Sequence, residues 1–319
     1  MNSQPKGSPC QVKNMYQSED KKYQRFFQAY NEQFASMCDL AISQYGRDTG
    51  REWAGGDGSL RNAVQNNMQE WFSRPFAPEY PGLTGDQLID GLASPADAIK
   101  FAAFAAACCD DELPDPIRVK LGSFGPDIGE KILTSIDRSV WENDENRTVE
   151  DEQAVAIGAA FLKLLGDWEN ADGLAAVLDG FTALNQPDER IADAIRYYIV
   201  ALDGQAILPV MDLIGQELER QQDLRPAAEY LLIALTDLGK TEPSDELFSC
   251  LRSCFRKMNH KTIGAICLGD YGDGRGIAVL KGWLDSHPEI RDRQLIGEIL
   301  SSIRRLGGDI SDLQHRLRL

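Results

Sequence analysis

Histidine is scarce in this chain of 319 residues, which contains only His260, His287 and His315. No two of them stand at the sequence spacing of metal ligands, and none lies beside a cluster of Cys or Glu. Protein zinc and iron sites are built from such combinations of His, Cys and carboxylate side chains. We therefore expect no metal site, and no motif in the chain indicates another cofactor.

Long apolar segments are also missing. No run reaches about 18 apolar residues, the length at which a helix can cross a bilayer. The polar N-terminus, MNSQPKGSPCQVKNMYQ, lacks the apolar stretch of a secretory signal. The seven cysteines are odd in number and match no disulfide spacing. These features predict a cytoplasmic protein with reduced thiols and no membrane span.

Sequence motifs of common enzyme classes are absent as well. The chain has no Gly-x-Ser-x-Gly elbow. Its segment GDYGDGRG, at 269–276, lacks the Gly-Lys-Ser/Thr ending of a phosphate loop and the distal Glu of an EF-hand. We therefore predict no catalytic residue. One alternative stays open, namely that folding brings carboxylates from distant segments together for acid–base chemistry.

Basic side chains are fewer than acidic ones, with 33 Lys and Arg against 50 Asp and Glu and a net charge of −17. The surplus lies in residues 91–247, which carry 12 basic and 31 acidic side chains, whereas residues 248–319 carry 12 and 8. An acidic field repels nucleic-acid backbones and attracts cations. We expect a protein partner that is basic or has a basic segment, and no nucleic acid. The alternative is that the acidic surplus only keeps the protein soluble.

What the chain does contain is a repeated pair of helices. Residues 263–284, IGAICLGDYGDGRGIAVLKGWL, have the pattern of a helix, a turn at Leu268-Gly269-Asp270, and a second helix. The same outline recurs around anchor leucines that are separated by 37, 36, 30 and 38 residues, namely Leu165, Leu202, Leu238, Leu268 and Leu306. Repeating helical hairpins of this length predict an all-α fold of the α-solenoid type.

The repeat resembles HEAT repeats, and it is most similar to the short HEAT-like kind first described in phycobilisome lyases. The resemblance covers roughly residues 95–319 and implies a solenoid of about five to six hairpins. It also implies structural roles for the turn Asp, at Asp270 or Asp273, and for the following Arg275. The chain lacks the His-Glu steps of HEAT-like deoxyhypusine hydroxylases. Its acidic middle differs from the basic groove of HEAT-like alkylpurine DNA glycosylases.

Local signals divide the chain into a disordered lead at 1–17, a helical cap or module at 18–93, and the repeat array at 94–319. First helices are predicted at 149–165, 187–202, 225–238, 260–269 and 289–306. Their partners are predicted at 171–184, 206–221, 243–258, 275–286 and 309–318. Residues 141–153 form an acidic linker that ends with Thr148 as an N-cap. Helix ends with left-handed caps are predicted at four glycines, Gly166, Gly204, Gly239 and Gly269.

The first 90 residues are rich in aromatic side chains and hold 12 of the 26 in the chain. Five of them recur at helical spacing as a stripe, namely Tyr23, Phe26, Phe27, Tyr30 and Phe34. This stripe is either the core of a divergent cap, which seals the first repeat against water, or a separate recognition surface.

By the HEAT resemblance, a partner lies along the concave side, which the second helices line. The polar positions on those helices are the candidate partner-binding residues, and they change from acidic to basic along the array: Asp179, Asp212, Gln216, Glu219, Arg252 and Arg256. The sequence thus predicts a non-catalytic interaction scaffold, adaptor or inhibitor. The alternative is an enzyme or lyase with a small-ligand pocket between the N-terminal module and the first repeats.

Overall fold

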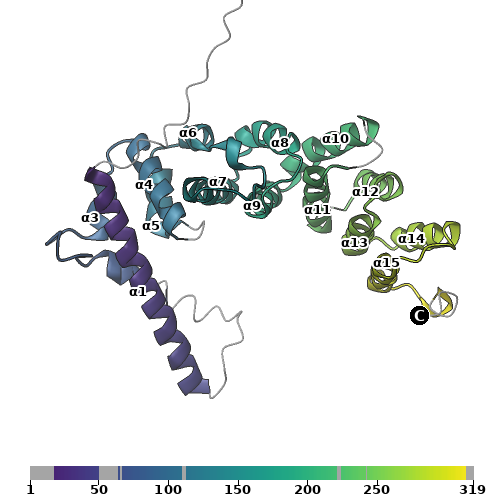
Figure 1. Cartoon of the computed structure of the whole chain (residues 1–319), viewed down its shortest axis with the longest axis horizontal. Coiled ribbons are helices and arrows are strands. Elements are labelled where there is room, and N and C mark those ends of the chain that lie inside the picture. Colours follow the sequence, from purple (N-terminus) through teal and green to yellow (C-terminus); the bar gives the residue numbers. More distant parts are fainter. Residues whose placement is uncertain are drawn as a thin grey trace, which may run out of the picture. The chain divides into compact units, whose positions relative to one another are not determined.

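A computed structural model describes residues 18–49, 64, 67–109, 113–220, 224–241 and 243–313. Within these ranges the regular structure is helical, and the only β-type contacts are isolated bridges, such as that between Glu142 and Pro187. Figure 1 shows the succession of helices along the chain. The all-α class is therefore confirmed. The predicted disordered lead at 1–17 lies outside the described residues.

The chain forms two compact units. The first comprises Met1–Asp137 with Thr148–Ala160, and the second comprises Arg138–Arg147 with Phe161–Leu319. The predicted boundary between residues 93 and 94 lies inside the first unit and stays a prediction.

The first unit is built around an aromatic core on α1, Ser18–Thr49. Phe26 and Phe27 are fully buried, and Phe26 packs edge-on against Phe76 with ring centroids 5.1 Å apart. Most of the predicted stripe is therefore core, although Phe34 is 43% exposed. Trp71 and Phe72, which belong to the helical residues 67–72, pack against the same cluster of rings.

Capping signals in the sequence explain the other helices of this unit. Thr84 makes a capping box with Gln87 at the start of α3, Gly85–Asp90. Ser94 caps α4, Pro95–Cys108, and its first residue is a proline, which is tolerated at the first helical position. Two short helices follow, α5 at Asp115–Gly122 and α6 at Ile128–Ser135.

In the second unit, helices alternate between two sets. The first helices are α9 Glu189–Ala201, α11 Pro226–Thr241, α13 Lys261–Tyr271 and α15 Arg293–Arg305. The second helices are α8 Leu174–Thr182, α10 Gly204–Arg220, α12 Asp245–Lys257 and α14 Arg275–Ser286. They follow α7, Val149–Asp167, whose last residues belong to this unit. Each agrees with a predicted helix to within a few residues, and the predicted helix at 309–318 lies partly outside the described residues.

The first helices pack on one another in succession, α9 on α11, α11 on α13 and α13 on α15. Among the second helices, α10 contacts both α8 and α12. Figure 1 shows α9, α11, α13 and α15 following one another along one side of the unit, with α8, α10, α12 and α14 on the other. The second unit therefore has two layers, which we call the first-helix layer and the second-helix layer.

The four predicted glycine caps are wrong, because none of these glycines adopts the left-handed conformation. Gly204 begins α10, and the other three lie inside helices where the next first helix comes closest. A Cβ on Gly239 would lie 2.5 Å from the Tyr271 ring, and one on Gly269 would lie 2.7 Å from the Ser302 side chain. These glycines permit close helix packing. The left-handed positions come just after the helices, at Glu169, Asp203, Gly272 and Gly307.

The segment predicted as an acidic linker makes specific contacts with the rest of the fold. Trp141 is fully buried, and its carbonyl accepts the Asp188 N–H at 2.8 Å. The carboxylate of Glu142 accepts the backbone N–H groups of Asn185 and Gln186 at 3.0 and 2.7 Å. Thr148 caps α7 as predicted, by accepting the Asp151 N–H at 3.2 Å. Residues 138–147 are thus hydrogen-bonded to the loop before α9.

Candidate functional site

The acidic candidates lie on neighbouring second helices. Asp179 is exposed on α8, and Asp212, Gln216 and Glu219 are exposed on α10, which contacts α8. Spacings of four and three residues place the α10 side chains on one face of the helix. None of their four side chains makes a hydrogen bond or ion pair within the described part of the chain. We call these residues the acidic row.

The apolar face of α10 fixes the direction of the acidic row. Val210 and Ile214 are fully buried. Glu217 is also buried, and its carboxylate is bound by the Arg225 guanidinium at 2.7 and 2.9 Å. Because these residues anchor the helix, the opposite face is held toward solvent. That face also presents Leu208, which is 68% exposed and which the sequence-based prediction did not include.

The acidic potential extends to the first-helix layer. Burial, followed by the charges of four carboxylates, raises the pKa of Tyr230 on α11; the carboxylates are those of Glu189, Asp193, Asp188 and Glu229. Glu229 also contacts the His260 ring nitrogen Nδ1 at 3.2 Å. The middle of the second unit is therefore negative on both layers.

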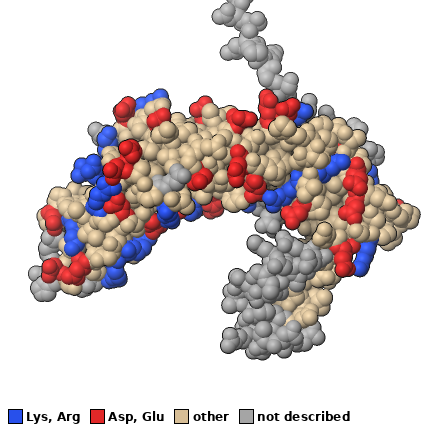
Figure 2. Space-filling model, turned by 180° about the vertical axis from the view of Figure 1, so that it is seen from behind, with Lys and Arg blue, Asp and Glu red and all other residues tan. Residues whose placement is uncertain are grey.

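The basic candidates lie on α12. Arg256 is exposed, whereas Arg252 is half-buried and its Nε is closed off from solvent without an acceptor in the described residues. Figure 2 shows basic side chains gathered over the C-terminal helices, at the left, and acidic ones spread over the middle. The structure thus places the six candidates on α8, α10 and α12, with the change of charge between α10 and α12.

Ion pairs between consecutive hairpins use many of the remaining carboxylates. Arg275, at the start of α14, binds Asp273 in its own turn and Asp245 at the start of α12, at 2.6 and 2.7 Å. Its guanidinium also lies 4.3 Å from the centre of the Phe248 ring. The hydrogen bond from Arg275 lowers the pKa of Asp273. The expected structural role of Asp273 and Arg275 is confirmed.

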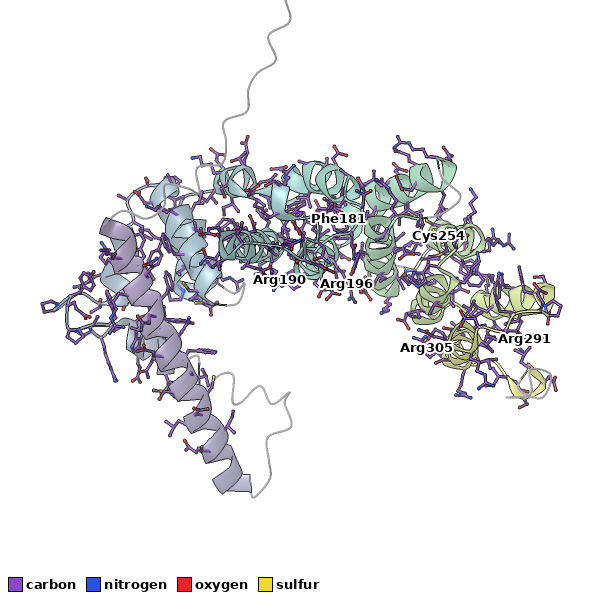
Figure 3. The ribbon with its side chains drawn as sticks, viewed as in Figure 1. Phe181, Arg190, Arg196, Cys254, Arg291 and Arg305 are labelled. Atoms are coloured by element: carbon purple, nitrogen blue, oxygen red, sulfur yellow. The ribbon has the colours of Figure 1, made fainter. Side chains whose placement is uncertain are left out.

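Asp270 has the matching role on the first-helix layer, where it pairs with Arg305 of α15. Arg196 of α9 likewise binds Asp237 of α11 at 2.6 Å, and Lys240 binds the same carboxylate at 2.7 Å. Figure 3 shows Arg196 and Arg305 on this layer. These pairs do not involve the acidic row, whose three carboxylates have no cationic partner among the described residues.

One buried ion pair was missed by the sequence-based analysis. Arg147 and Asp188 have only 7% and 10% of their side chains exposed, and their charged groups are in direct contact. Arg147 also donates to the carbonyls of Val140 and Glu142. Burial opposes ionisation of Asp188, but the hydrogen bond and charge of Arg147 outweigh it and lower its pKa. A lone Arg in an acidic segment was the only sequence signal.

The thiols of the second unit are packed, as predicted. Cys254 and Cys267 are buried, and all six cysteines in the described residues are free. Figure 3 shows Cys254 on α12. Burial raises the pKa of Cys267 to about 12. The described residues contain no group of three side chains placed to bind a metal ion.

No helix in the described residues has the length and apolarity to cross a membrane. No family model matches this chain, and no match was found among curated proteins or solved structures.

Proposed function

We propose that the second unit is an α-solenoid of HEAT-like hairpins that binds a basic protein partner through the second-helix layer, without catalysis. The observation that carries this proposal is the acidic row. Its three carboxylates are exposed and have no partner in the described residues, whereas Asp245 and Asp273 on the same layer are bound by Arg275. A partner with matching cations would supply the missing charges, and the attraction would also steer it to the site.

The solenoid part of the proposal is supported by the repeated contacts between hairpins. Each first helix from α9 to α13 packs on the next, and two glycines allow the close approach. The pairs Arg275–Asp245 and Arg305–Asp270 join consecutive hairpins on both layers. In a solenoid each hairpin buries its apolar face only against its neighbours, so the polar outer faces form one extended surface. Such surfaces suit an adaptor, scaffold or inhibitor.

The partner surface combines charge with one apolar position. Leu208 precedes Asp212 by one helical turn and is 68% exposed. A basic amphipathic segment therefore fits this face, with an apolar side chain over Leu208 and Lys or Arg near Asp212 and Glu219. The compartment in which they meet is proposed to be the cytoplasm, which is supported by the free buried thiols.

Charge reversal tests this proposal. The double variant Asp212→Lys, Glu219→Lys should weaken binding of a basic partner about tenfold or more, because two attractive pairs become repulsive. The measurement is affinity capture from the native lysate with mass spectrometry, at about 50 and about 300 mM salt, since screening shortens the reach of exposed charges. A captured basic protein is then purified, and its affinity is measured by titration calorimetry.

The matched control is Glu145→Lys, Glu289→Lys, which changes the net charge equally at two exposed loop positions. It should retain the wild-type affinity, and helical circular dichroism should be unchanged in both variants. Equal weakening by the two double variants would reduce the effect to net charge. Unchanged binding by Asp212→Lys, Glu219→Lys would remove the acidic row from the interface.

A further inference from the structure

Two arginines of α12, Arg252 and Arg256, have no carboxylate partner in the described residues, unlike several other arginines of this unit. Arg275 and Arg305 each bind two carboxylates, and Arg225 binds Glu217. Arg252 and Arg256 form no ion pair with any residue that the structure describes. They are four residues apart, so they lie on the same side of α12 one turn from each other.

Contacts along α12 show which side this is. Asp245 and Phe248 of α12 both contact Arg275 of α14. Residues four apart lie on the same side of a helix, so Arg252 and Arg256 lie on the same flank of α12 as Phe248. Farther along, Phe255 packs edge-on against Trp283 of α14 at 6.0 Å. Arg252 and Arg256 therefore lie on the flank of α12 that faces α14, which we call the α12–α14 seam.

The Nε–H of Arg252 is an unsatisfied donor at this seam, since the atom is closed off from solvent and has no acceptor in the described residues. Buried donors in folded proteins are nearly always matched, and an unmatched one costs free energy. The side chain as a whole is only half-buried. An anion that reaches the seam would supply the missing acceptor.

The helix end nearby does not oppose an anion. The last carbonyls of α12 carry partial negative charge, as at any helix C-terminus. Lys261 donates from Nζ to the carbonyls of Phe255 and Arg256 at 2.6 and 2.9 Å. The ammonium group thus neutralises this end of the helix beside Arg256, and the seam keeps its positive charge.

We propose that Arg252 and Arg256 form a binding site for a phosphate monoester. Elsewhere in this protein one arginine binds one or two carboxylates, as Arg225 and Arg275 do. Two neighbouring arginines without a carboxylate leave two positive charges, which match a phosphate dianion. Guanidinium groups bind phosphate oxygens through paired N–H donors. This site is independent of the acidic row and has the opposite charge preference.

The first test follows the Nε–Hε signals of arginines by two-dimensional NMR on the full chain, with inorganic phosphate as the probe at constant ionic strength. The Arg252 signal, assigned by its loss in Arg252→Gln, should shift and saturate. In Arg252→Gln the affinity for phosphate should fall about tenfold or more. Arg252→Lys keeps the charge but loses the fork of donors, and its affinity should fall as well.

The matched control is Arg304→Gln, which removes one exposed arginine from α15 and should retain the wild-type affinity. The proposal is overturned if the Arg252 signal does not saturate with phosphate. It is also overturned if sodium chloride produces the same shift, or if Arg304→Gln weakens binding as much as Arg252→Gln. Circular dichroism of each variant identifies loss of fold, and Arg256→Gln provides a second, exposed position for the same comparison.

A second titration identifies the source of the phosphate group. Free O-phosphoserine is compared with a phosphoserine peptide and with its unphosphorylated form. Tighter binding of the phosphopeptide supports a phosphorylated polypeptide, and equal binding of the two phosphate compounds supports a small metabolite. Equal binding of the phosphorylated and unphosphorylated peptides would overturn the site.

Discussion

The buried pair of Arg147 and Asp188 gives the sharpest prediction about stability. Arg147→Ala removes the donor to three acceptors at once, namely the Asp188 carboxylate and the carbonyls of Val140 and Glu142. Asp188 then keeps only its capping contacts to the N–H groups of α9 and a distant Arg190, at 3.7 Å. In the wild type the Asp188 side chain is only 10% exposed, so loss of Arg147 leaves a poorly solvated charge without its main partner.

The expected loss is about 3 to 5 kcal/mol, the usual effect of removing one partner from a buried ion pair. The three hydrogen bonds do not add to this figure, because they share one guanidinium. Much of the loss in stability comes from leaving the buried Asp188 carboxylate without its partner. Because residues 138–147 are hydrogen-bonded to the loop before α9, the free energy of unfolding of the whole second unit should fall by this amount.

Native-state hydrogen exchange with mass spectrometry measures this effect locally, which matters because a chain of two units need not unfold in one step. Amides of α9 should exchange about a hundredfold to several thousandfold faster in Arg147→Ala. Arg293→Ala is the control, since Arg293 is exposed and unpaired in the described residues, and its change should stay within about 0.5 kcal/mol. A loss below about 1 kcal/mol in Arg147→Ala would refute the reasoning.

The effect of pH follows from the lowered pKa of Asp188. Its stabilisation is fully present above the unfolded-state pKa, about 3.9, and is lost as the pH falls through the lower folded-state pKa. The gap in stability between the wild type and Arg147→Ala should therefore be largest near pH 7 and shrink as the pH falls toward 2, because protonation of Asp188 removes the charge that Arg147 binds. A gap that does not change down to pH 2 would contradict this assignment of the charge.

Three further outcomes are expected. Gly269→Ala should destabilise the protein by about 1 to 3 kcal/mol in urea unfolding, because the new methyl group would lie 2.7 Å from the Ser302 side chain. Gly297→Ala on α15 meets nothing within 4 Å and should instead stabilise by about 0.5 to 1 kcal/mol; equal effects would refute the packing role. Iodoacetamide at pH 8 should leave Cys267 unlabelled in the native protein and label it in urea, since its pKa is about 12; native labelling would contradict its burial. The Tyr198 phenol, whose pKa burial raises to about 12, should stay protonated at pH 11 in an ultraviolet titration that Tyr198→Phe assigns.

The positions of most helices could be predicted because their signals are local. Ser94, Thr148 and the prolines at the starts of α4 and α11 act within one helical turn, and apolar periodicity gives the buried faces. The structural role of Arg275 is expected from the resemblance to HEAT repeats, which leaves its partner open between Asp270 and Asp273; the structure shows that it is Asp273. The charge change along the second helices likewise requires only helical spacing.

Other features could not be predicted because they depend on residues far apart in the chain. Arg147 meets Asp188 across 41 residues, and the acidic surroundings of Arg147 in sequence favour a solvated linker. The glycines were assigned to helix ends because a turn and a close helix contact both select for the absence of a Cβ. Only the position of the next helix distinguishes the two.

The sequence by itself determined an all-helical chain with repeated hairpins, an acidic middle and a more basic end, since periodicity, caps and charge are properties of neighbouring residues. Tertiary structure decided which charges are used and which stay free. Asp245, Asp270 and Asp188 are bound by arginines from distant segments, whereas Asp212, Glu219, Arg252 and Arg256 have no such partner in the described residues. The physical reason is that an ion pair depends on distance in space, which packing sets and residue spacing does not.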